Sequence, residues 1–347
     1  MSRTKTIIHL ILLAVVIALL FGWLGIQPLG LEEPRRAVVA MEMDMSGDYI
    51  APSILGEPYY KKPPVWNWVL VAAFRIFGDH SEFTIRFFSV LSFILTGLML
   101  FWAVDSNIGR KEAWPAMLLY LTSADLFLYF SLKAEIDLFY SLLIFSMIVF
   151  IYYFLKKEKC LPLFLITYLL GAIAFLTKGM PTLLFIALSL GAAFIMEGRF
   201  RRLFSWQHAG GILLFTLIVG SYFYIYSKRS DPAGFLQVLW SESSQRTVAE
   251  RPFRELVIHV IEFPLIFLKN LMPASLLLLF MFRHGRELMK HPFLRYAIVI
   301  TLVNALVYWF SPGSRPPYTY MLYPLLIAWL VAGYYYEGTV EGREAKI

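Results

Sequence analysis

The sequence predicts an all-α integral membrane protein, a polytopic bundle of about ten transmembrane helices with amphipathic interfacial helices in its first outer loop. Of the 347 residues, 59% are hydrophobic and only 16% are charged, and the mean hydropathy is +0.65. Soluble domains of this length carry a larger share of charged side chains. Apolar runs near the length that crosses a hydrocarbon core recur along the whole chain.

The first apolar run follows Arg3 and Lys5, as it would in a signal peptide. The sequence Gly25-Ile26-Gln27-Pro28 after it lacks a small-residue cleavage pattern, which favours an uncleaved first span. The predicted spans are 7–26, 84–104, 113–131, 136–155, 160–176, 180–196, 208–226, 263–282, 293–310 and 318–336.

The short loops between these spans predict the orientation. With the N-terminus inside, the inner loops 107–112, 156–159, 197–202 and 282–290 each carry Lys or Arg. Cytoplasmic loops are enriched in these residues, so we expect both termini in the cytoplasm. Residues 27–83 and 227–262 then form two outer loops, whereas an inverted chain would expose the basic clusters outside.

Composition also excludes several classes of function. The formal charge of +7 is explained by the basic inner loops, so nucleic acid is not an expected partner. Cys160 is the single cysteine, which rules out a disulfide or a cysteine-based metal site within one chain.

The first outer loop opens with LEEPRRAV at residues 31–38. Pro34 suits the first turn of a helix, apolar residues follow it at helical spacing, and Ser46-Gly47-Asp48 ends the pattern. This indicates an amphipathic helix in the interface. A second such helix is expected around Trp66 and Phe74.

Between these two helices lies GEPYYKKPP, residues 56–64. Its prolines favour an extended or turning backbone. Neighbouring Tyr and Lys side chains at headgroup level suit a phosphate, because they supply hydroxyls and compact positive charge. The alternative is a plain interfacial anchor, which composition alone favours.

The stretch from EEPRRAVVAMEMDMSGDYIAPSILGEPYYKKPPVWNW to EFTIRFFSVLS resembles the first outer loop of the aminoarabinose transferase and protein mannosyltransferase superfamily. The likeness continues at LKAEIDLFYS, AFLTKGMP, LWSESSQRT and SPGSRPPYTYMLYPLL, and covers nearly the whole chain. These proteins are glycosyltransferases of the GT-C fold, family 39 and its bacterial relatives.

The resemblance implies one transmembrane glycosyltransferase domain over residues 1–347, without a separate soluble domain. It also implies transfer of a sugar from a polyprenyl-phosphate donor to a glycolipid, glycan or protein acceptor, on the outer face of the inner membrane. Membrane lipid would be the other partner. The alternatives are a lipid-linked sugar transporter and a non-catalytic protein that binds lipid phosphate. A transporter would favour inverted repeats and mid-membrane charges, and the sequence has no repeat.

The implied reaction needs a carboxylate to orient or deprotonate the acceptor, and cations to stabilise the leaving phosphate. Glu32 matches the family's catalytic acid, which is more often Asp, and Glu33 matches the second acid of that pair. Asp137 matches a further acid, at the outer start of the fourth span. A helix-start charge is the simpler alternative for all three. The predicted phosphate-binding residues are Lys62, Tyr59, Lys178, Arg35, Arg315 and Arg246.

Four local expectations concern the positions of charged residues. Glu135 and Asp137 should lie on different helix faces, so that one side chain can point into the bundle and the other away from it. Lys178 should open the sixth span, where helix N–H groups favour an anion. Arg86, at the outer start of the second span, is expected to pair with an acid of the first loop. Arg246 is one helical turn from Glu242 and can pair with it.

A divalent cation is the only cofactor considered, and Glu32 and Asp137 are its candidate ligands. The family's metal-binding pattern places Glu and His where this chain has Lys61 and Ser243. The histidines show no ligand spacing such as H-x-x-x-H.

Overall fold

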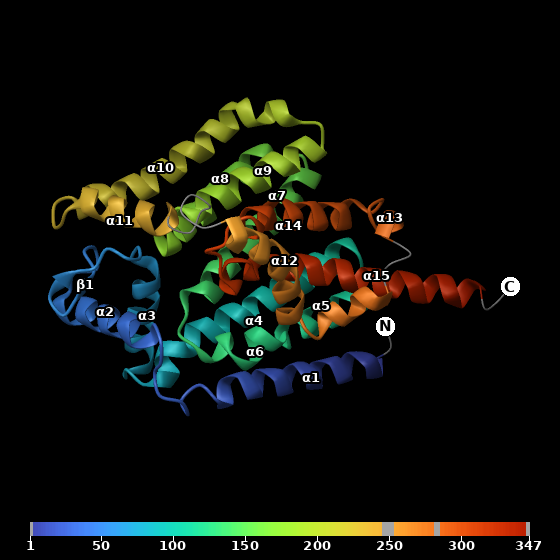
Figure 1. The fold of residues 1–347 in the computed structure, drawn as a ribbon, viewed down its shortest axis with the longest axis horizontal. Helices are drawn as coiled ribbons and strands as arrows, with labels where there is room; N and C mark the ends of the chain where they lie inside the picture. The colour runs from blue at the N-terminus through green and yellow to red at the C-terminus, as the bar shows by residue number, and fades with distance from the viewer. Residues whose placement is uncertain (1–2, 245–252, 281–284, 345–347) are drawn as a thin grey trace.

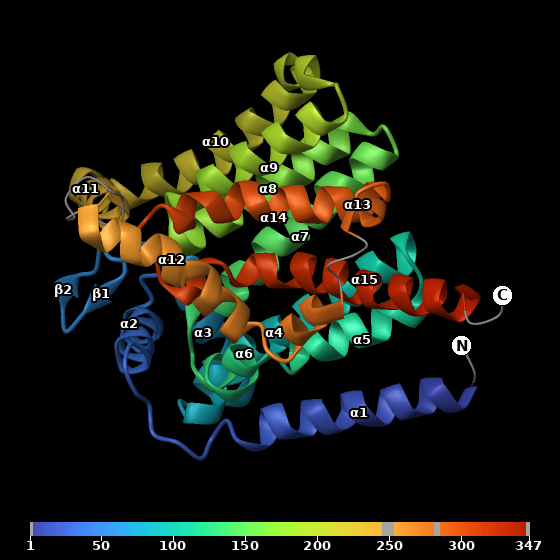
Figure 2. The same ribbon diagram turned by 45° about the vertical axis from the view of Figure 1, so that its right-hand side comes forward.

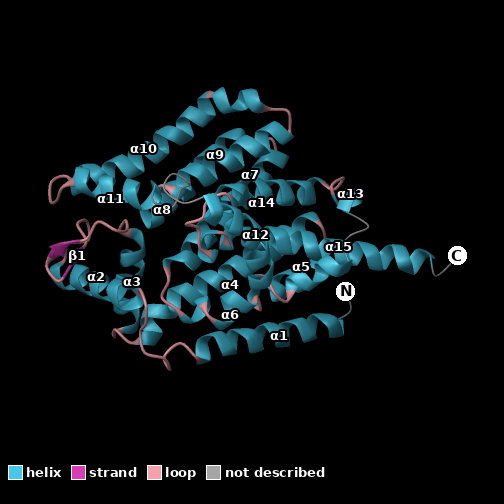
Figure 3. Ribbon diagram, viewed as in Figure 1, coloured by secondary structure: helices cyan, strands magenta, loops and turns pink. Residues whose placement is uncertain are grey.

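The computed structural model describes residues 3–244, 253–280 and 285–344 (Figure 1). It is a helical bundle, and the strands in this part of the chain are confined to one short hairpin (Figure 3). The elements are α1 (Arg3–Gly22), α2 (Glu33–Ser46), β1 (Ser53–Ile54), β2 (Glu57–Pro58), α3 (Val65–Phe77), α4 (Glu82–Asn107), α5 (Arg110–Leu121), α6 (Ala124–Leu128), η1 (Phe130–Leu132), α7 (Ile136–Lys156), α8 (Cys160–Lys178), α9 (Pro181–Met196), η2 (Phe200–Phe204), α10 (Trp206–Tyr226), α11 (Pro232–Ser244), α12 (Phe253–Asn270), η4 (Ala274–Phe280), α13 (Gly285–Leu288), α14 (Pro292–Trp309), η5 (Pro316–Tyr318), η6 (Tyr320–Leu322) and α15 (Tyr323–Glu344).

Six described helices are long and apolar enough to cross a membrane, namely α1, α4, α7, α8, α10 and α14. Two bent helix pairs raise the number to eight if each pair is one span, and α9 is a shorter apolar helix. The predicted polytopic helical fold is confirmed, whereas the predicted number of ten spans is not.

Two predicted spans are bent. The expected span 113–131 is divided between α5 and a second segment at 46°, where the Thr122 and Ser123 hydroxyls bond carbonyls one turn back. The expected span 263–282 breaks after α12, and η4 leaves at 106°. Pro273 lies at this break and cannot donate the hydrogen bond that would continue a helix.

The bundle is built around α4, α7 and α8. Helix α8 packs against α7 and α10, while α4 packs against α5 and α7, and one large apolar cluster joins these helices. Helix α1 lies along the outside of the bundle, largely exposed (Figure 2). It begins at the same end of the bundle as α15 finishes, opposite the end that carries α2, α3 and the hairpin (Figures 1 and 2).

Local sequence explains the predicted interfacial helices. Pro34 lies in the first turn of α2, and the helix ends at Gly47, which adopts φ +70° and donates its N–H to the Met43 carbonyl at 3.1 Å. Leu55 and Gly56, both with positive φ, form the two-residue turn between β1 and β2. Both helices predicted between the first and second spans are therefore present, as α2 and α3.

Helices α2 and α3 are attached to the spans by a second apolar cluster. Ala40 of α2 and Trp66 and Leu70 of α3 pack with Ile85 at the start of α4 and Ile136 at the start of α7. Each buried apolar contact adds to the stability of this cluster. Together the contacts hold the first turn of α2 near the start of α7.

Candidate active site

A charged cavity of about 830 Å³ lies where α2, α7 and α8 meet. It is formed by the start of α2, the segment after the hairpin, η1, the start of α7, the end of α8 and the loop before η6. Its lining residues are Leu31, Glu32, Arg35, Arg36, Lys61, Lys62, Tyr129, Phe130, Lys133, Glu135, Ile136, Asp137, Lys178, Gly313, Arg315, Pro316, Pro317 and Tyr318.

Seven lysine and arginine side chains and three carboxylates line the charged cavity, so its formal charge is +4. Like charges gathered in a concave site repel one another and attract counter-ions of opposite sign. The cavity therefore suits an anionic ligand. Six of the predicted site residues line it: Glu32, Asp137, Arg35, Lys62, Lys178 and Arg315.

Glu32 lies at the N-cap of α2, where its side chain is 46% exposed and pairs with Arg35. Both side chains line the charged cavity. A carboxylate that is half exposed and held by one neighbouring guanidinium keeps oxygen lone pairs for a ligand. This geometry suits a base that contacts an acceptor.

Asp137 forms a buried ion pair with Lys178 across the cavity wall. The Lys178 ammonium also lies 4.9 Å from the ring centre of Tyr140 and 4.8 Å from that of Tyr318. Cation–π contacts and the carboxylate together compensate the loss of water around a buried ammonium. The pair thus places one fixed positive charge beside Asp137.

The expectation that Lys178 opens a helix is wrong. Lys178 is the last residue of α8, and the next helix, α9, begins at Pro181. A cation at a helix C-terminus is favoured by the helix dipole. The predicted fifth span ends at residue 176, but α8 continues for two more residues before Gly179, with φ +85°, turns the chain.

Arg36 and Glu135 form a second buried pair, 2.9 Å apart, which the sequence did not single out. Glu135 is the residue before α7, so its backbone is extended and its side chain lines the charged cavity together with Asp137. The prediction that these two acids face different ways is therefore wrong. Burial raises the pKa of Glu135, and the Arg36 charge only partly offsets this effect.

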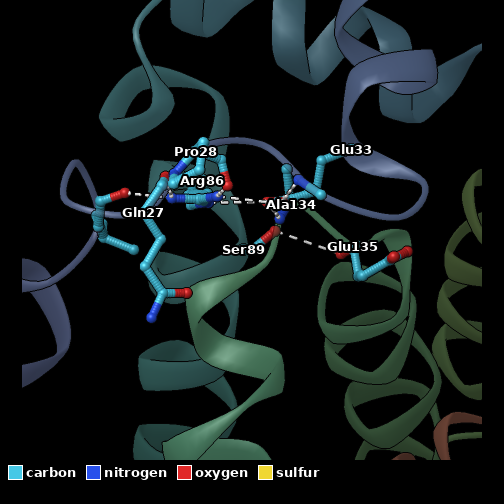
Figure 4. A network of polar contacts seen from close by, with 9 residues as sticks. Gln27, Pro28, Glu33, Arg86, Ser89, Ala134 and Glu135 are labelled. Atoms are coloured by element: carbon cyan, nitrogen blue, oxygen red, sulfur yellow. Dashed lines mark hydrogen bonds and ion pairs between the residues drawn. The ribbon is translucent and has the colours of Figure 1, made fainter.

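Arg86 is 1% exposed and forms a two-point ion pair with Glu33, at 2.8 Å for Nε–Oε1 and 3.0 Å for Nη2–Oε2 (Figure 4). The predicted pairing of Arg86 with an acid of the first loop is confirmed. Its remaining N–H groups donate to the carbonyls of Leu24, Gln27 and Pro28, at 2.7 to 3.1 Å. One guanidinium thus fixes the α1–α2 connection onto α4.

Glu33 is fully buried and accepts two further hydrogen bonds, from Gly30 N–H at 2.9 Å and Ala134 N–H at 2.7 Å (Figure 4). Burial raises its pKa, but the hydrogen bonds from Arg86, Gly30 and Ala134 outweigh it and keep the pKa below its ordinary value. Glu33 does not line the charged cavity. This position does not suit the catalytic contact predicted for Glu33. It suits a residue that holds Glu32 in place.

The lowered pKa of Glu33 predicts a pH dependence of stability. The ionised pair contributes fully above the ordinary Glu pKa of about 4.3, and its contribution is lost as pH falls through the lower folded-state value. We expect wild type and Glu33→Gln to differ most in free energy of unfolding near pH 7, and to converge as pH falls from about 5 to 3. A difference that stays constant with pH would contradict this prediction.

Tyr59 and Arg246 are the remaining predicted phosphate-binding residues. Tyr59 is buried outside its lining, and its backbone N–H donates to the Pro52 carbonyl at 2.8 Å. Arg246 and its predicted pairing with Glu242 lie outside the residues whose side chains the structure describes. The additional polar residues that the fold brings to the cavity are Arg36, Lys61, Tyr129, Lys133, Glu135 and Tyr318.

The side chains present do not fit a metal site. Within residues 3–244, 253–280 and 285–344, no group of three or more His, Cys, Asp or Glu side chains could hold a metal ion. The two candidate ligands, Glu32 and Asp137, each pair with a cation of the chain. The positive charge of the charged cavity comes from its lysine and arginine side chains.

Comparison with known sequences matches residues 61–226 to the family described as dolichyl-phosphate-mannose-protein mannosyltransferase. Proteins named undecaprenyl phosphate-alpha-4-amino-4-deoxy-L-arabinose arabinosyl transferase are also similar. The protein from Yersinia enterocolitica is 26% identical over 88% of this chain and 56% of its own length. The protein from Aeromonas hydrophila is 29% identical over 63% of this chain and 40% of its own length.

Comparison of structures finds ArnT from Cupriavidus metallidurans. Its apo crystal structure aligns with a TM-score of 0.74 and 21% identity, over 96% of this chain and 60% of that one. Its structure bound to undecaprenyl phosphate aligns with a TM-score of 0.71 and 20% identity over the same shares. The chain therefore spans less than two thirds of each of these relatives. The predicted resemblance to the GT-C-type aminoarabinose transferase and protein mannosyltransferase superfamily is confirmed.

Proposed function

We propose that the protein is a membrane glycosyltransferase that transfers a sugar from a polyprenyl-phosphate donor to a glycolipid, glycan or protein acceptor. The observation that carries this proposal is the charged cavity, in which a half-exposed Glu32 lies among seven cationic side chains. The relatives are named as arabinosyl transferases that use an aminoarabinose on undecaprenyl phosphate, which supports this pentose donor as the first to test.

In the proposed mechanism, the lysine and arginine side chains hold the donor phosphate. They stabilise the negative charge that grows on this phosphate as its bond to the sugar breaks. Glu32 accepts a proton from the attacking group of the acceptor, and this makes the acceptor a better nucleophile. Asp137 fixes the Lys178 ammonium, and Glu135 fixes Arg36, so that these cations are already oriented when the phosphate enters. The charged groups gather at one end of the bundle, which favours an enzyme over a transporter with mid-membrane sites.

The function is tested by supplying purified, reconstituted protein with undecaprenyl-phosphate aminoarabinose and membrane extracts. We expect release of undecaprenyl phosphate that depends on an acceptor fraction. Mass spectrometry of envelope glycolipids and glycoproteins from a deletion strain would identify that acceptor. Identical spectra in the deletion strain and its parent, together with no donor turnover, would contradict the proposal.

The proposed location is the cytoplasmic (inner) membrane, with both termini in the cytoplasm and the charged cavity on the outer side. The basic inner loops support this orientation. A reporter that is active only after export, fused after residue 347, should therefore be inactive, while the same reporter inserted after Gly56 should be active. Strong activity of the C-terminal fusion would reverse the orientation and the face proposed for catalysis.

Lys62 and Lys178 are proposed to bind the donor phosphate. Charged hydrogen bonds are worth about 1.5–3 kcal/mol, so Lys62→Ala and Lys178→Ala should each weaken binding of undecaprenyl phosphate by about tenfold to a hundredfold. The matched control is Lys228→Ala, since Lys228 is exposed near α10 and does not line the cavity. Affinity unchanged in both cavity variants would remove these lysines from the site.

A further inference from the structure

A second cavity, of about 340 Å³, lies between α8, α9 and α10. Its walls are mainly apolar and include Leu183, Ile186, Leu190 and Phe215. The volume falls within the range of ligand-binding sites, about 300–1,000 Å³. It shares no lining residue with the charged cavity.

The packing of small residues explains why this apolar cavity exists. A Cβ at Gly171 or Gly211 would collide with Ile186 or with Tyr168, so these glycines let α8 approach both α9 and α10 closely. Farther along α9, a Cβ at Gly191 would meet nothing within 4 Å. The space in front of Gly191, which lines the cavity, is therefore open.

The polar groups in the cavity wall already satisfy one another. The Tyr168 hydroxyl and His208 Nε2 are 2.6 Å apart, and His208 Nδ1 contacts the Leu203 carbonyl. A neutral imidazole that donates from Nδ1 to the carbonyl accepts the Tyr168 proton at Nε2, so both ring nitrogens are used. The cavity therefore suits an apolar ligand.

Positive charge and aromatic rings lie beside this cavity. Leu203 of its wall belongs to η2, which also carries Arg201 and Arg202. Both arginines are exposed and form no ion pair with the part of the chain that the structure describes. The neighbouring side chains of Phe204 and Trp206 are 80% and 69% exposed. Exposed aromatic and basic residues together are typical of a membrane–water interface.

We propose that this cavity binds an anionic phospholipid, with one acyl chain between α9 and α10 and the headgroup phosphate against Arg201 and Arg202. The apolar walls match the chain, and the two arginines match the phosphate in charge. Helix α8 ends at Lys178 in the charged cavity, whereas η2 adjoins the opposite end of the bundle, so the lipid would belong to the other leaflet. This site does not depend on the proposed transferase activity.

The test uses the full chain in phosphatidylcholine nanodiscs containing a small fraction of phosphatidylglycerol with a photoreactive group in its acyl chain. We expect labelling to concentrate on residues 183–215. Gly191→Phe should reduce it several-fold, while Gly220→Phe, which also points into open space, should not. The variant with Arg201→Gln and Arg202→Gln should lower labelling by about fivefold per charge removed. These arginines are exposed, so this variant tests the site even if Gly191→Phe fails to fold.

A second probe, phosphatidylcholine with the same photoreactive chain, should label the segment less than phosphatidylglycerol does and should be insensitive to the arginine changes. Equal labelling by both lipids, or labelling spread evenly over exposed helices such as α1, would overturn the proposal. Loss of labelling on adding undecaprenyl phosphate would also overturn it, because the cavity would then belong to the carrier lipid.

Discussion

Replacing Glu32 by Gln is expected to lower sugar transfer by about a hundredfold to ten-thousandfold, the usual cost of losing a general base. Gln keeps the size and part of the hydrogen bonding of Glu, but it cannot accept the proton. Glu32 is half exposed at the N-cap of α2, so this change should leave the fold intact. The measurement is the initial rate of transfer in reconstituted membranes at matched expression.

Two variants accompany this experiment. Glu32→Asp should retain partial activity, because it keeps the negative charge on a shorter side chain. Glu57→Gln is the matched control, since Glu57 is an exposed carboxylate of the same loop that does not line the charged cavity. Near-normal transfer by Glu32→Gln would make the charged stretch at 31–38 an interfacial anchor and would leave Asp137 as the candidate base.

Replacing Arg86 by Ala is expected to destabilise the protein by about 3–5 kcal/mol, because it leaves the Glu33 charge buried without its partner. It also removes the donors to three carbonyls of the α1–α2 connection. Unfolding in mixed micelles with increasing sodium dodecyl sulfate, followed by tryptophan fluorescence, measures the difference in free energy. Glu33→Gln should give an intermediate loss, since its carbonyl oxygen still accepts one of the backbone N–H groups.

Arg75→Ala provides the comparison for Arg86→Ala. Arg75 pairs with Asp44 at 2.9 Å, but its side chain is 61% exposed. Exposed pairs contribute about 0–1 kcal/mol, so this variant should be nearly as stable as wild type. A loss at Arg86 as small as the loss at Arg75 would show that the buried pair does not hold the fold together.

Features that depend on neighbouring residues could be predicted from the sequence. Apolar run length identified six of the ten predicted spans, and Pro34 and Gly47 marked the ends of α2, because helix starts and stops follow from backbone geometry within a few residues. Glu32, Lys62, Asp137 and Lys178, which line one cavity, were also expected in the site, chiefly through family resemblance. Neither charge pattern nor spacing places residues from four separate segments in one cavity.

Features that depend on tertiary contacts could not be predicted in the same way. Arg36 and Glu135 are 99 residues apart, and nothing in either local sequence indicates their pairing. Glu33 and Glu32 are adjacent acids, yet one is buried against Arg86 and the other faces the cavity. Only the packing of α2 on α3, α4 and α7 decides which of the two turns inward.

The buried contacts of Arg86 and Glu33 have a consequence for biogenesis. Glu33 accepts hydrogen bonds from Arg86 and from the Ala134 N–H. These bonds therefore cannot form until the ribosome has synthesised the chain up to the start of α7. Helix α1 packs weakly on the bundle, is synthesised before α4 and α7, and must remain nearby until then. Docking of α1 therefore cannot be completed until 101 residues after Glu33 have been synthesised. Arg86 variants should consequently be degraded by membrane quality control more often than their remaining activity would suggest.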